Sequence, residues 1–373
     1  MKPKRLGLIV NPVAGLGGRV GLKGSDGLYI QKRAREFGAK PRCQERTVDA
    51  LQRLQPLKED LHILTYPGEM GADAALASGF QVHCLGSIRP GKTTAEDTRA
   101  SACEILRGQA DLLLFAGGDG TARDICQAVA DQLPVLGIPA GVKIHSAAFA
   151  TNPINAGELS ALYLTGKVSR LRDAEVLDID EDAYRQGAMA TKLYGYLKTP
   201  QKASLVQNLK LASNPSESAA VHTIARFVVD RMESDCLYIL GPGTTTRAIA
   251  QQLDLDKTLL GVDILFQRQL QASDANEERL LQGLRGWPAK IIVSPIGGQG
   301  YLFGRGNQQI SPSVISLVGK QNIIVISTED KIHALHGAPL LVDTGSRRLD
   351  ERLTGYVRVI TGYDEQIFYK VAC

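Results

Sequence analysis

Short apolar runs alternate with helical stretches through most of the chain, and this alternation constrains the fold more than any other feature. Each run is apolar and is followed by Gly, Pro or Asn, which is typical of a buried strand. In the first half of the chain the runs are Leu6–Val10, Leu61–Thr65, Gln81–Leu85, Asp111–Ala116 and Pro134–Ile138. Helical segments such as Gly27–Phe37, Ala95–Arg107 and Thr121–Gln132 lie between them. The pattern predicts an α/β fold, an open parallel sheet covered on both faces, with ligands at the carboxyl ends of its strands.

The pattern changes near residue 166 and returns after residue 220. Val176–Ile179 and Lys192–Leu197 read as strands of a less regular region, and Ser204–Ser218 is polar and linker-like. Strand candidates then resume at Cys236–Leu240, Leu259–Ile264, Lys290–Ser294, Asn322–Ser327 and Tyr356–Thr361. We therefore expect a first domain over residues 1–165, an irregular insertion or connection over 166–220, and a second, mainly α/β domain over 221–373.

Charge and composition exclude several classes of protein. The net charge of +4 is too small to indicate nucleic acid as the main partner. No stretch approaches the roughly 20 apolar residues that span a bilayer, and Leu6–Val10 is too short for a signal-peptide core. The six cysteines are scattered without a Cys-x-x-Cys pair, which argues against a zinc ribbon or a disulfide framework. We expect a cytoplasmic protein with no nucleic-acid or membrane partner.

Four of the predicted strands run into glycine-rich turns. Glycine after a strand permits positive φ and lets a ligand approach the backbone closely, and a helix that begins there presents its free N–H groups. Phosphate is the ligand that such a turn suits best, although a single turn is equally explained as a tight connection. The four turns are Asn11–Gly18, Gly117–Thr121, Gly241–Thr246 and the longer segment Pro295–Asn307. We assign the strands before the last two turns to one parallel sheet, so we expect both turns to open at its carboxyl edge.

Asp119 is the candidate catalytic residue, because it lies among three glycines between a buried strand and a helix. A carboxylate there can accept or orient the proton of a substrate hydroxyl while nearby amides hold phosphates. The alternative is that Asp119 caps the helix that begins near Thr121. The sequence contains no Walker-type phosphate loop and no G-x-G-x-x-G dinucleotide motif, and its histidines form no metal-binding pattern.

The Gly-Gly-Asp-Gly-Thr run at Gly117–Thr121 resembles the motif of the NAD kinase and diacylglycerol kinase superfamily. Asn11-Pro12-Val13-Ala14-Gly15 is similar to the Asn-Pro-x-x-Gly element that opens the same domain, and Pro139–Ser146 also has a counterpart there. The run Gly297–Gln309 resembles a segment of the branch of ATP- or polyphosphate-dependent NAD kinases that includes the AcoX-like proteins. The resemblance implies an NAD kinase/diacylglycerol kinase-like first domain.

The resemblance also implies roles for individual residues. Asp119 would contact the acceptor hydroxyl, and the remaining residues would line phosphate or ribose sites: Asn11, Gly15, Gly117, Gly118, Gly120 and Thr121. The glycine turns after the later strands, together with candidate charge partners, add further residues to the candidate site: Lys143, Gly241, Gly243, Thr244, Thr245, Gly297, Gly298, Arg305 and Asn307. The donor would be ATP or polyphosphate, with magnesium neutralising its charge. Members of the family commonly form homo-oligomers, so we expect one here.

The resemblance has one departure that bears on the substrate. NAD kinases of the standard type carry an adjacent Asn-Glu pair in a β-rich second domain, whereas Asn276-Glu277 here lies on a predicted surface helix. The sequence therefore favours phosphorylation of the 2′-hydroxyl of NAD but leaves two alternatives open. One is a kinase of another hydroxyl, on a lipid or a polyol. The other is a nucleotide-binding sensor without turnover, because the GPGTTT run at Gly241–Thr246 resembles loops that bind sugar phosphates.

Overall fold

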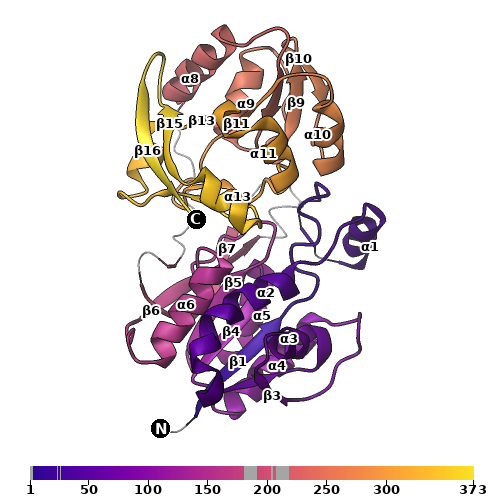
Figure 1. Ribbon diagram of the computed structural model, residues 1–373, viewed down its shortest axis with the longest axis vertical. Helices are drawn as coiled ribbons and strands as arrows, with labels where there is room; N and C mark the ends of the chain where they lie inside the picture. Colours follow the sequence, from indigo (N-terminus) through magenta and orange to yellow (C-terminus); the bar gives the residue numbers. More distant parts are fainter. Residues whose placement is uncertain (1–2, 23, 26, 180–190, 203–204, 207–217) are drawn as a thin grey trace. The chain divides into compact units, whose positions relative to one another are not determined.

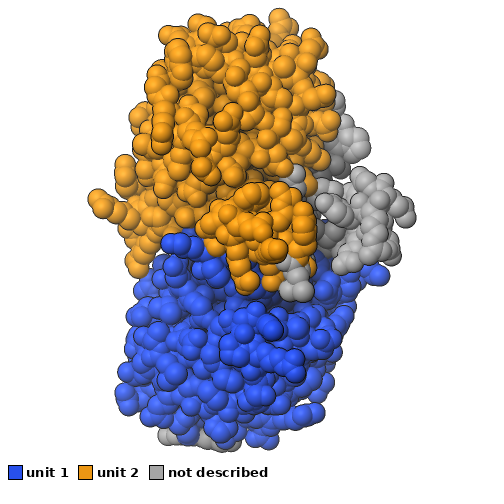
Figure 2. Space-filling model, turned by 90° about the vertical axis from the view of Figure 1, so that its right-hand side faces the viewer, with its two compact units in different colours: residues 1–16, 40–209 blue, residues 17–39, 210–373 orange. Residues whose placement is uncertain are grey.

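The chain forms two compact units in a computed structural model, which describes residues 3–22, 24–25, 27–179, 191–202, 205–206 and 218–373. Unit 1 comprises residues 1–16 and 40–209, and unit 2 comprises residues 17–39 and 210–373 (Figure 2). The early segment 17–39 is tied to unit 2, where the backbone N–H of Glu277 donates to the carbonyl of Arg19 at 3.2 Å. The domain boundaries expected near residues 165 and 220 stay a prediction.

Unit 1 is built on a five-stranded sheet with the order β3-β2-β1-β4-β5, in which all neighbouring strands are parallel (Figure 1). Its strands are β1 (Lys4–Val10), β2 (Leu61–Thr65), β3 (Gln81–Cys84), β4 (Leu112–Gly117) and β5 (Val135–Pro139). Apart from one or two residues at their ends, these are the five strands that the apolar runs predict. The parallel sheet expected from the sequence is confirmed.

Helices cover both faces of this sheet because successive side chains of each strand point to opposite sides. Leu6 and Leu8 of β1 belong to one core with Leu51, Leu54 and Leu159. The opposite core joins Ile9 to Phe115, Ile105 and Ile125. The helices of unit 1 are α2 (Cys43–Leu51), α3 (Ala72–Ala77), α4 (Ala95–Arg107), α5 (Asp119–Val129) and α6 (Pro153–Leu164), with 3-10 helices at Gln52–Asp60 and Gly68–Met70.

The region after residue 166 contributes an antiparallel pair, β6 (Leu171–Ile179) and β7 (Thr191–Pro200), to unit 1. Both strands are longer than the short runs predicted there. Ala174, Val176 and Leu197 are buried in the same core as Ile125 of α5, so the pair packs on that helix. Most of the polar stretch Ser204–Ser218 lies outside the described residues.

Unit 2 contains a nine-stranded mixed sheet with the order β10-β9-β8-β11-β13-β15-β16-β14-β12. Strands β8, β11, β13 and β15 run parallel, as expected for a second α/β domain. The strand expected at Leu259–Ile264 is β9, which begins later, at Asp263, and runs antiparallel to β8. The strands are β8 (Leu237–Leu240), β9 (Asp263–Phe266), β10 (Gln269–Ala272), β11 (Ala289–Val293), β12 (Tyr301–Phe303), β13 (Ile323–Ile326), β14 (Leu340–Val342), β15 (Gly355–Ile360) and β16 (Gln366–Ala372).

Two buried clusters again lie on the two faces of the sheet, one containing Ile239 and Val293 and the other containing Tyr238 and Ile292. The helices of unit 2 are α1 (Leu28–Glu36), α8 (Ser218–Asp230), α9 (Thr244–Gln251), α10 (Glu277–Gly283), α11 (Pro312–Val318), α12 (Glu329–His333) and α13 (Arg347–Leu353). Across the described parts of both units, no helix has the length and apolar content needed to cross a membrane.

Candidate active site at the carboxyl edge of the unit 1 sheet

Three loops converge where β1, β4 and β5 end, and their backbones are in direct contact. The backbone N–H groups of Ala140 and Gly141, after β5, both donate to the carbonyl of Gly117, at 2.9 and 3.0 Å. The loop after β1 approaches as closely, because a side chain on Gly15, whose φ is 75°, would clash with the carbonyl of Ala140. Two of the four glycine-rich turns predicted from the sequence, those after β1 and β4, therefore meet at one edge of the parallel sheet, where ligands of such folds bind.

Asn11 joins two of these loops. Its side-chain Nδ2 donates to the Thr121 hydroxyl at 2.9 Å, and its backbone N–H donates to the carbonyl of Ala116 at 2.9 Å. Gly117 makes room for this arrangement, since a Cβ there would lie 2.5 Å from the side chain of Thr121. Asn11 and Thr121, both predicted to line the site, thus hold the ends of β1 and α5 together.

None of the three glycines of the Gly117–Thr121 turn has positive φ, and two of them, Gly117 and Gly118, allow close packing. Gly118 has an extended backbone, with φ of −120° and ψ of −165°, and neither Gly117 nor Gly120 has a positive φ. Gly118 is tightly packed, because a Cβ on it would lie 3.2 Å from the Cα of Gly141. A Cβ on Gly120 would instead make only ordinary van der Waals contacts, 3.8 Å from Asp178 Oδ2 and 4.0 Å from Arg123 Nη2. Asp119 and Gly120 are the first residues of α5, where backbone N–H groups have no partner within the helix.

Asp119 is buried, 7% exposed, and its carboxylate faces the loop after β5. Oδ2 accepts from the backbone N–H of His145 at 2.7 Å, while Oδ1 accepts from the backbone N–H of Ser146 at 3.0 Å and from its hydroxyl at 2.6 Å. Gly118 is the N-cap residue of α5, and no side-chain capping hydrogen bond forms there. The alternative reading of Asp119 as a helix cap is therefore wrong.

Burial is the largest influence on the Asp119 carboxyl group and raises its pKa to about 7. The hydrogen bonds from Ser146 and His145 stabilise the carboxylate and oppose this rise, whereas the negative charge of Asp178 adds to it. A carboxyl group with a pKa near neutrality is suited to taking a proton from a hydroxyl at physiological pH. The geometry thus supplies a candidate general base.

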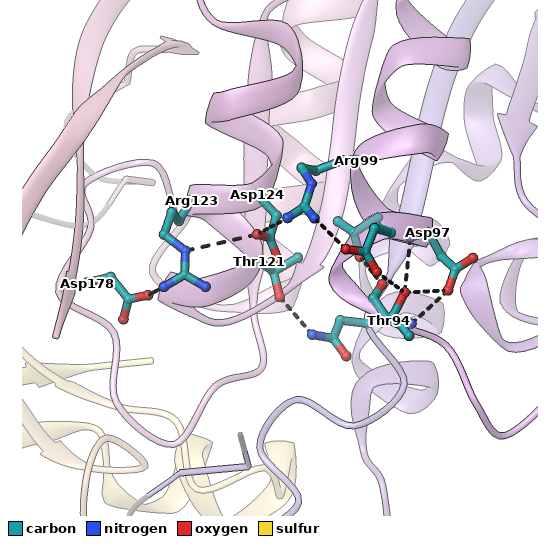
Figure 3. Close-up of polar contacts among 10 residues, drawn as sticks. Thr94, Asp97, Arg99, Thr121, Arg123, Asp124 and Asp178 are labelled. Carbon is teal, nitrogen blue, oxygen red and sulfur yellow. Dashed lines mark hydrogen bonds and ion pairs between the residues drawn. The ribbon is translucent and has the colours of Figure 1, made fainter. Parts of the chain in front are cut away.

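Two residues that the sequence did not single out lie next to Gly120. Figure 3 shows Arg123 of α5 paired with Asp178 of β6, with 2.8 Å between Nη1 and Oδ2. A second pair joins Arg99 Nη1 of α4 to Asp124 Oδ1 of α5 at 3.1 Å (Figure 3). The Arg123-Asp124 dipeptide, which follows Thr121 after one alanine, was a signal that sequence reasoning could have used, whereas nothing around Asp178 indicated its position.

The remaining candidate of unit 1 is Lys143. It is half-buried in the loop after β5, two residues before His145, which donates to Asp119. The structure therefore brings together Asn11, Gly15, Gly117, Gly118, Asp119, Gly120, Thr121 and Lys143 through three adjoining loops of unit 1.

In unit 2 the turn Gly241–Thr246 connects β8 to α9, with Gly243 at a φ of 120°. The hydroxyl of Thr246 donates within the turn, and the hydroxyl of Thr245 accepts from Lys331 Nζ at 2.7 Å. Lys331 comes from α12, which follows β13, so a cation from another strand end lies beside the turn. Gly241, Gly243, Thr244 and Thr245 therefore lie at the carboxyl edge of the unit 2 sheet.

The segment Pro295–Asn307 is not a single loop, because β12 divides it. Gly297 and Gly298 follow β11, which is parallel to β8, as expected. Gly304 and the residues after it follow β12, which pairs parallel with β14, and β14 pairs parallel with β16. Since β16 is antiparallel to β15, β12 runs opposite to β8 and β11. The expectation that the whole segment opens at one carboxyl edge is wrong for residues 304–307.

Arg305 and Asn307 have structural partners within unit 2. The Arg305 guanidinium forms a buried ion pair with Asp343, at 3.2 Å, and lies 4.8 Å from the centre of the Tyr301 ring. Asn307 donates to the carbonyl of Leu302 at 2.8 Å and accepts from the backbone N–H of Gly304 at 3.0 Å. Both side chains stabilise the turn after β12, and their predicted contacts with a ligand stay a prediction.

The parallel sheet of unit 1 and its convergent glycine loops define an α/β protein of the type that binds phosphate at strand ends. The chain belongs to the ATP-NAD kinase family. Residues 6–168 match the model of the ATP-NAD kinase N-terminal domain, and residues 233–371 match that of the C-terminal domain. Membership of the AcoX-like branch stays a prediction.

Among solved structures, the chain is similar to a diacylglycerol kinase from Bacillus anthracis str. Sterne, with 18% sequence identity and a TM-score of 0.24. The match covers 48% of this chain and 47% of that structure, so it spans about half of each. A second structure from the same strain is 17% identical over the same shares, with a TM-score of 0.25. A search of curated proteins found no match.

Proposed function

We propose that the protein is an NAD kinase that phosphorylates the 2′-hydroxyl of NAD, with ATP or polyphosphate as the donor. The observation that carries the proposal is the buried carboxylate of Asp119, with its pKa raised to about 7, at the meeting point of three glycine-containing loops. Membership of the ATP-NAD kinase family supplies the reaction class.

In the proposed reaction Asp119 takes the proton of the 2′-hydroxyl as the hydroxyl oxygen attacks the terminal phosphorus of the donor. A bond forms between that oxygen and phosphorus, and the bond from phosphorus to the bridging oxygen of the donor breaks. ADP, or polyphosphate one unit shorter, leaves with the bonding electron pair. The backbone N–H groups at the start of α5 would stabilise the charge that develops on the transferred group.

Magnesium is proposed to bind with the donor, where it would neutralise phosphate charge. The described residues include no group of three or more His, Cys, Asp and Glu side chains that could hold a metal ion. Magnesium commonly keeps its waters and is held by substrate phosphates together with one or two protein carboxylates. A magnesium ion that binds with the donor therefore needs no larger group of protein ligands.

We further propose that Gly241, Gly243, Thr244 and Thr245 bind a second phosphate or a ribose of the ligands. The support is the cation of Lys331, 2.7 Å from the Thr245 hydroxyl at the start of α9. Gly297, Gly298, Arg305 and Asn307 stay predictions as ligand contacts, as do a homo-oligomeric state and a cytoplasmic location.

The test is an assay of the purified protein with NAD, magnesium and either ATP or polyphosphate. NADP formation is measured by coupling to an NADP-specific dehydrogenase. We expect NADP with at least one donor, and a rate of NADP formation lower by roughly 10²–10⁴-fold in the Asp119→Asn variant. Transfer of phosphate only to a lipid or a polyol, or nucleotide binding without any transfer, would contradict the proposal and select one of the two alternatives.

A further inference from the structure

Arg123 is a cationic side chain whose guanidinium lies beside Gly120 of the Gly117–Thr121 turn. It follows Asp119 by four residues on α5, so both lie on the same face of the helix. Its guanidinium carbon lies 5.5 Å from the centre of the Tyr194 ring of β7, and its Nη1 donates to Asp178 Oδ2 at 2.8 Å. Two contacts from the β6–β7 pair therefore fix the orientation of the guanidinium plane.

The second terminal nitrogen of Arg123 lies beside Gly120, the second residue of α5. A Cβ on Gly120 would lie 4.0 Å from Arg123 Nη2 and 3.8 Å from Asp178 Oδ2. Nη1 is thus engaged by the aspartate while Nη2 lies next to the Gly117–Thr121 turn. A guanidinium has five N–H donors in a planar fork, so it can keep one carboxylate contact and still bind a phosphate oxygen.

We propose that Arg123 binds the phosphoryl group undergoing transfer, and that Asp178 and Tyr194 are positioning residues that hold its guanidinium in place. This inference rests on the proposed function, because it takes the start of α5 as the phosphate site. Arg123 forms and breaks no covalent bond. It stabilises charge on the oxygens of the transferred group, which the N–H groups of α5 alone would neutralise only in part.

The electrostatics of the cluster agree with this role. Burial lowers the pKa of Arg123, but the carboxylates of Asp178 and Asp124 outweigh burial and raise the pKa overall. Arg123 therefore stays charged at every pH at which the protein is folded. An arginine that is already oriented and charged loses little side-chain freedom when a phosphate binds.

Arg99 provides a matched control on the same pair of helices. It forms an ion pair with Asp124 at 3.1 Å, comparable to the Arg123–Asp178 pair, and its side chain is 35% exposed against 27% for Arg123. The experiment compares Arg123→Ala, Arg123→Lys and Arg99→Ala in two measurements. The first is kcat and KM for NADP formation, and the second is the affinity for inorganic triphosphate by calorimetry.

We expect Arg123→Ala to lower kcat by roughly 10²–10³-fold, the usual effect of removing one donor to a transition-state anion. It should also weaken triphosphate binding at least tenfold. Arg123→Lys should recover part of the affinity but not the full kcat, since an ammonium cannot hold the planar geometry. Arg99→Ala should leave both quantities within about twofold, with a similar loss of thermal stability to that of Arg123→Ala.

The outcomes separate this inference from the proposed function. If the wild type forms NADP and Arg123→Ala behaves like Arg99→Ala, the role of Arg123 is overturned and NAD kinase activity stands. If the wild type forms no NADP but binds triphosphate through Arg123, the phosphate role stands and the proposed reaction is wrong. If Arg123→Ala does not fold, a folded Arg123→Lys variant with wild-type kcat overturns the inference.

Discussion

At the scale of the single residue, Asp119 combines a structural and a proposed chemical role. Its two carboxylate oxygens accept three hydrogen bonds from His145 and Ser146, which attaches α5 to the loop after β5. The same burial that requires these partners also raises the pKa of the group to about 7. Substitutions at this position therefore change both stability and proton transfer, and a test has to separate the two.

We expect Asp119→Asn to lower kcat by roughly 10²–10⁴-fold, because the amide cannot accept the hydroxyl proton. It should also lower the free energy of unfolding by about 1–3 kcal/mol. The reason is that the asparagine NH₂ group faces a backbone N–H whose hydrogen bond the lost carboxylate oxygen had accepted, so two donors face each other. Kinetics and chemical denaturation of the same preparation measure both effects, and near-normal turnover by a folded variant would show that Asp119 is only structural.

Ser146→Ala is the companion variant, since it keeps the Asp119 carboxylate and removes one hydrogen bond that stabilises its charged form. In the wild type, kcat/KM should rise as the pH increases through about 7, the pKa of Asp119. In Ser146→Ala this limb of the profile should move to higher pH, because the carboxylate is less stabilised. An unmoved limb would assign it to a different group.

At the scale of secondary structure elements, the start of α5 offers two glycines with opposite constraints. A side chain on Gly118 would press on Gly141, whereas one on Gly120 meets only ordinary contacts. The Gly117–Thr121 turn thus has one tightly packed glycine and one whose position accommodates a methyl group in ordinary contact with its neighbours. This difference allows the fold and the ligand to be tested separately.

We predict that Gly120→Ala folds normally, with a free energy of unfolding up to about 1 kcal/mol higher, because alanine favours the helix. Its affinity for ATP or triphosphate should fall at least tenfold, since the methyl group occupies the space beside the proposed phosphate. Gly118→Val should lose both stability and affinity. Unchanged affinity in Gly120→Ala, measured by calorimetry, would remove this turn from the binding site.

In unit 2, the turn after β12 contains the buried ion pair between Arg305 and Asp343. We expect Arg305→Ala to destabilise unit 2 by about 3–5 kcal/mol, because it leaves the buried Asp343 carboxylate without this cation. Thermal denaturation measures the effect, with exposed Arg347→Ala as the control, whose pair with Glu351 lies at the surface. A stable Arg305→Ala variant with a raised KM for NAD would instead support a ligand contact.

At the scale of the whole molecule, the two units have separate hydrophobic cores. The two clusters of unit 1 contain only residues between 6 and 206, and the two of unit 2 contain only residues between 224 and 371. Each unit also contains a buried titratable group whose shifted pKa lies at neutral or mildly alkaline pH: Asp119 in unit 1 and Lys257 in unit 2. Burial lowers the pKa of Lys257 to about 8.

We therefore expect two unfolding transitions in calorimetry, with opposite responses to pH. Folded unit 1 holds an extra proton on Asp119 between its ordinary pKa of 3.8 and about 7, so its stability should fall as pH rises through this range. Folded unit 2 lacks a proton on Lys257 between about 8 and 10.5, so its stability should rise over that range. A single transition, or transitions that shift together in both ranges, would contradict this independence.

The substitutions provide a control for the same expectation. Asp119→Asn should shift only the transition of unit 1 and remove its pH dependence between 3.8 and about 7. Arg305→Ala should shift only the transition of unit 2, since its partner Asp343 lies in that unit.

The sequence by itself determined the parallel sheet of unit 1 and the glycine turns at its strand ends. These features are local: an apolar run followed by glycine predicts a strand and its turn from a few adjacent residues. The same local signal identified Asp119 and its neighbours as the candidate site. It also predicted β8 and β11 as parallel strands of a second sheet, which the structure confirms.

Only the tertiary structure decided which distant residues meet at the site. Ser146 lies 27 residues from Asp119, and Asp178 lies 55 residues from Arg123, so no helical or strand period relates them. The direction of β12 likewise depends on its pairing with β14, which places Arg305 in a buried ion pair and not at the carboxyl edge of β8. Such contacts arise from the packing of whole elements, because burial requires partners that the local sequence does not specify.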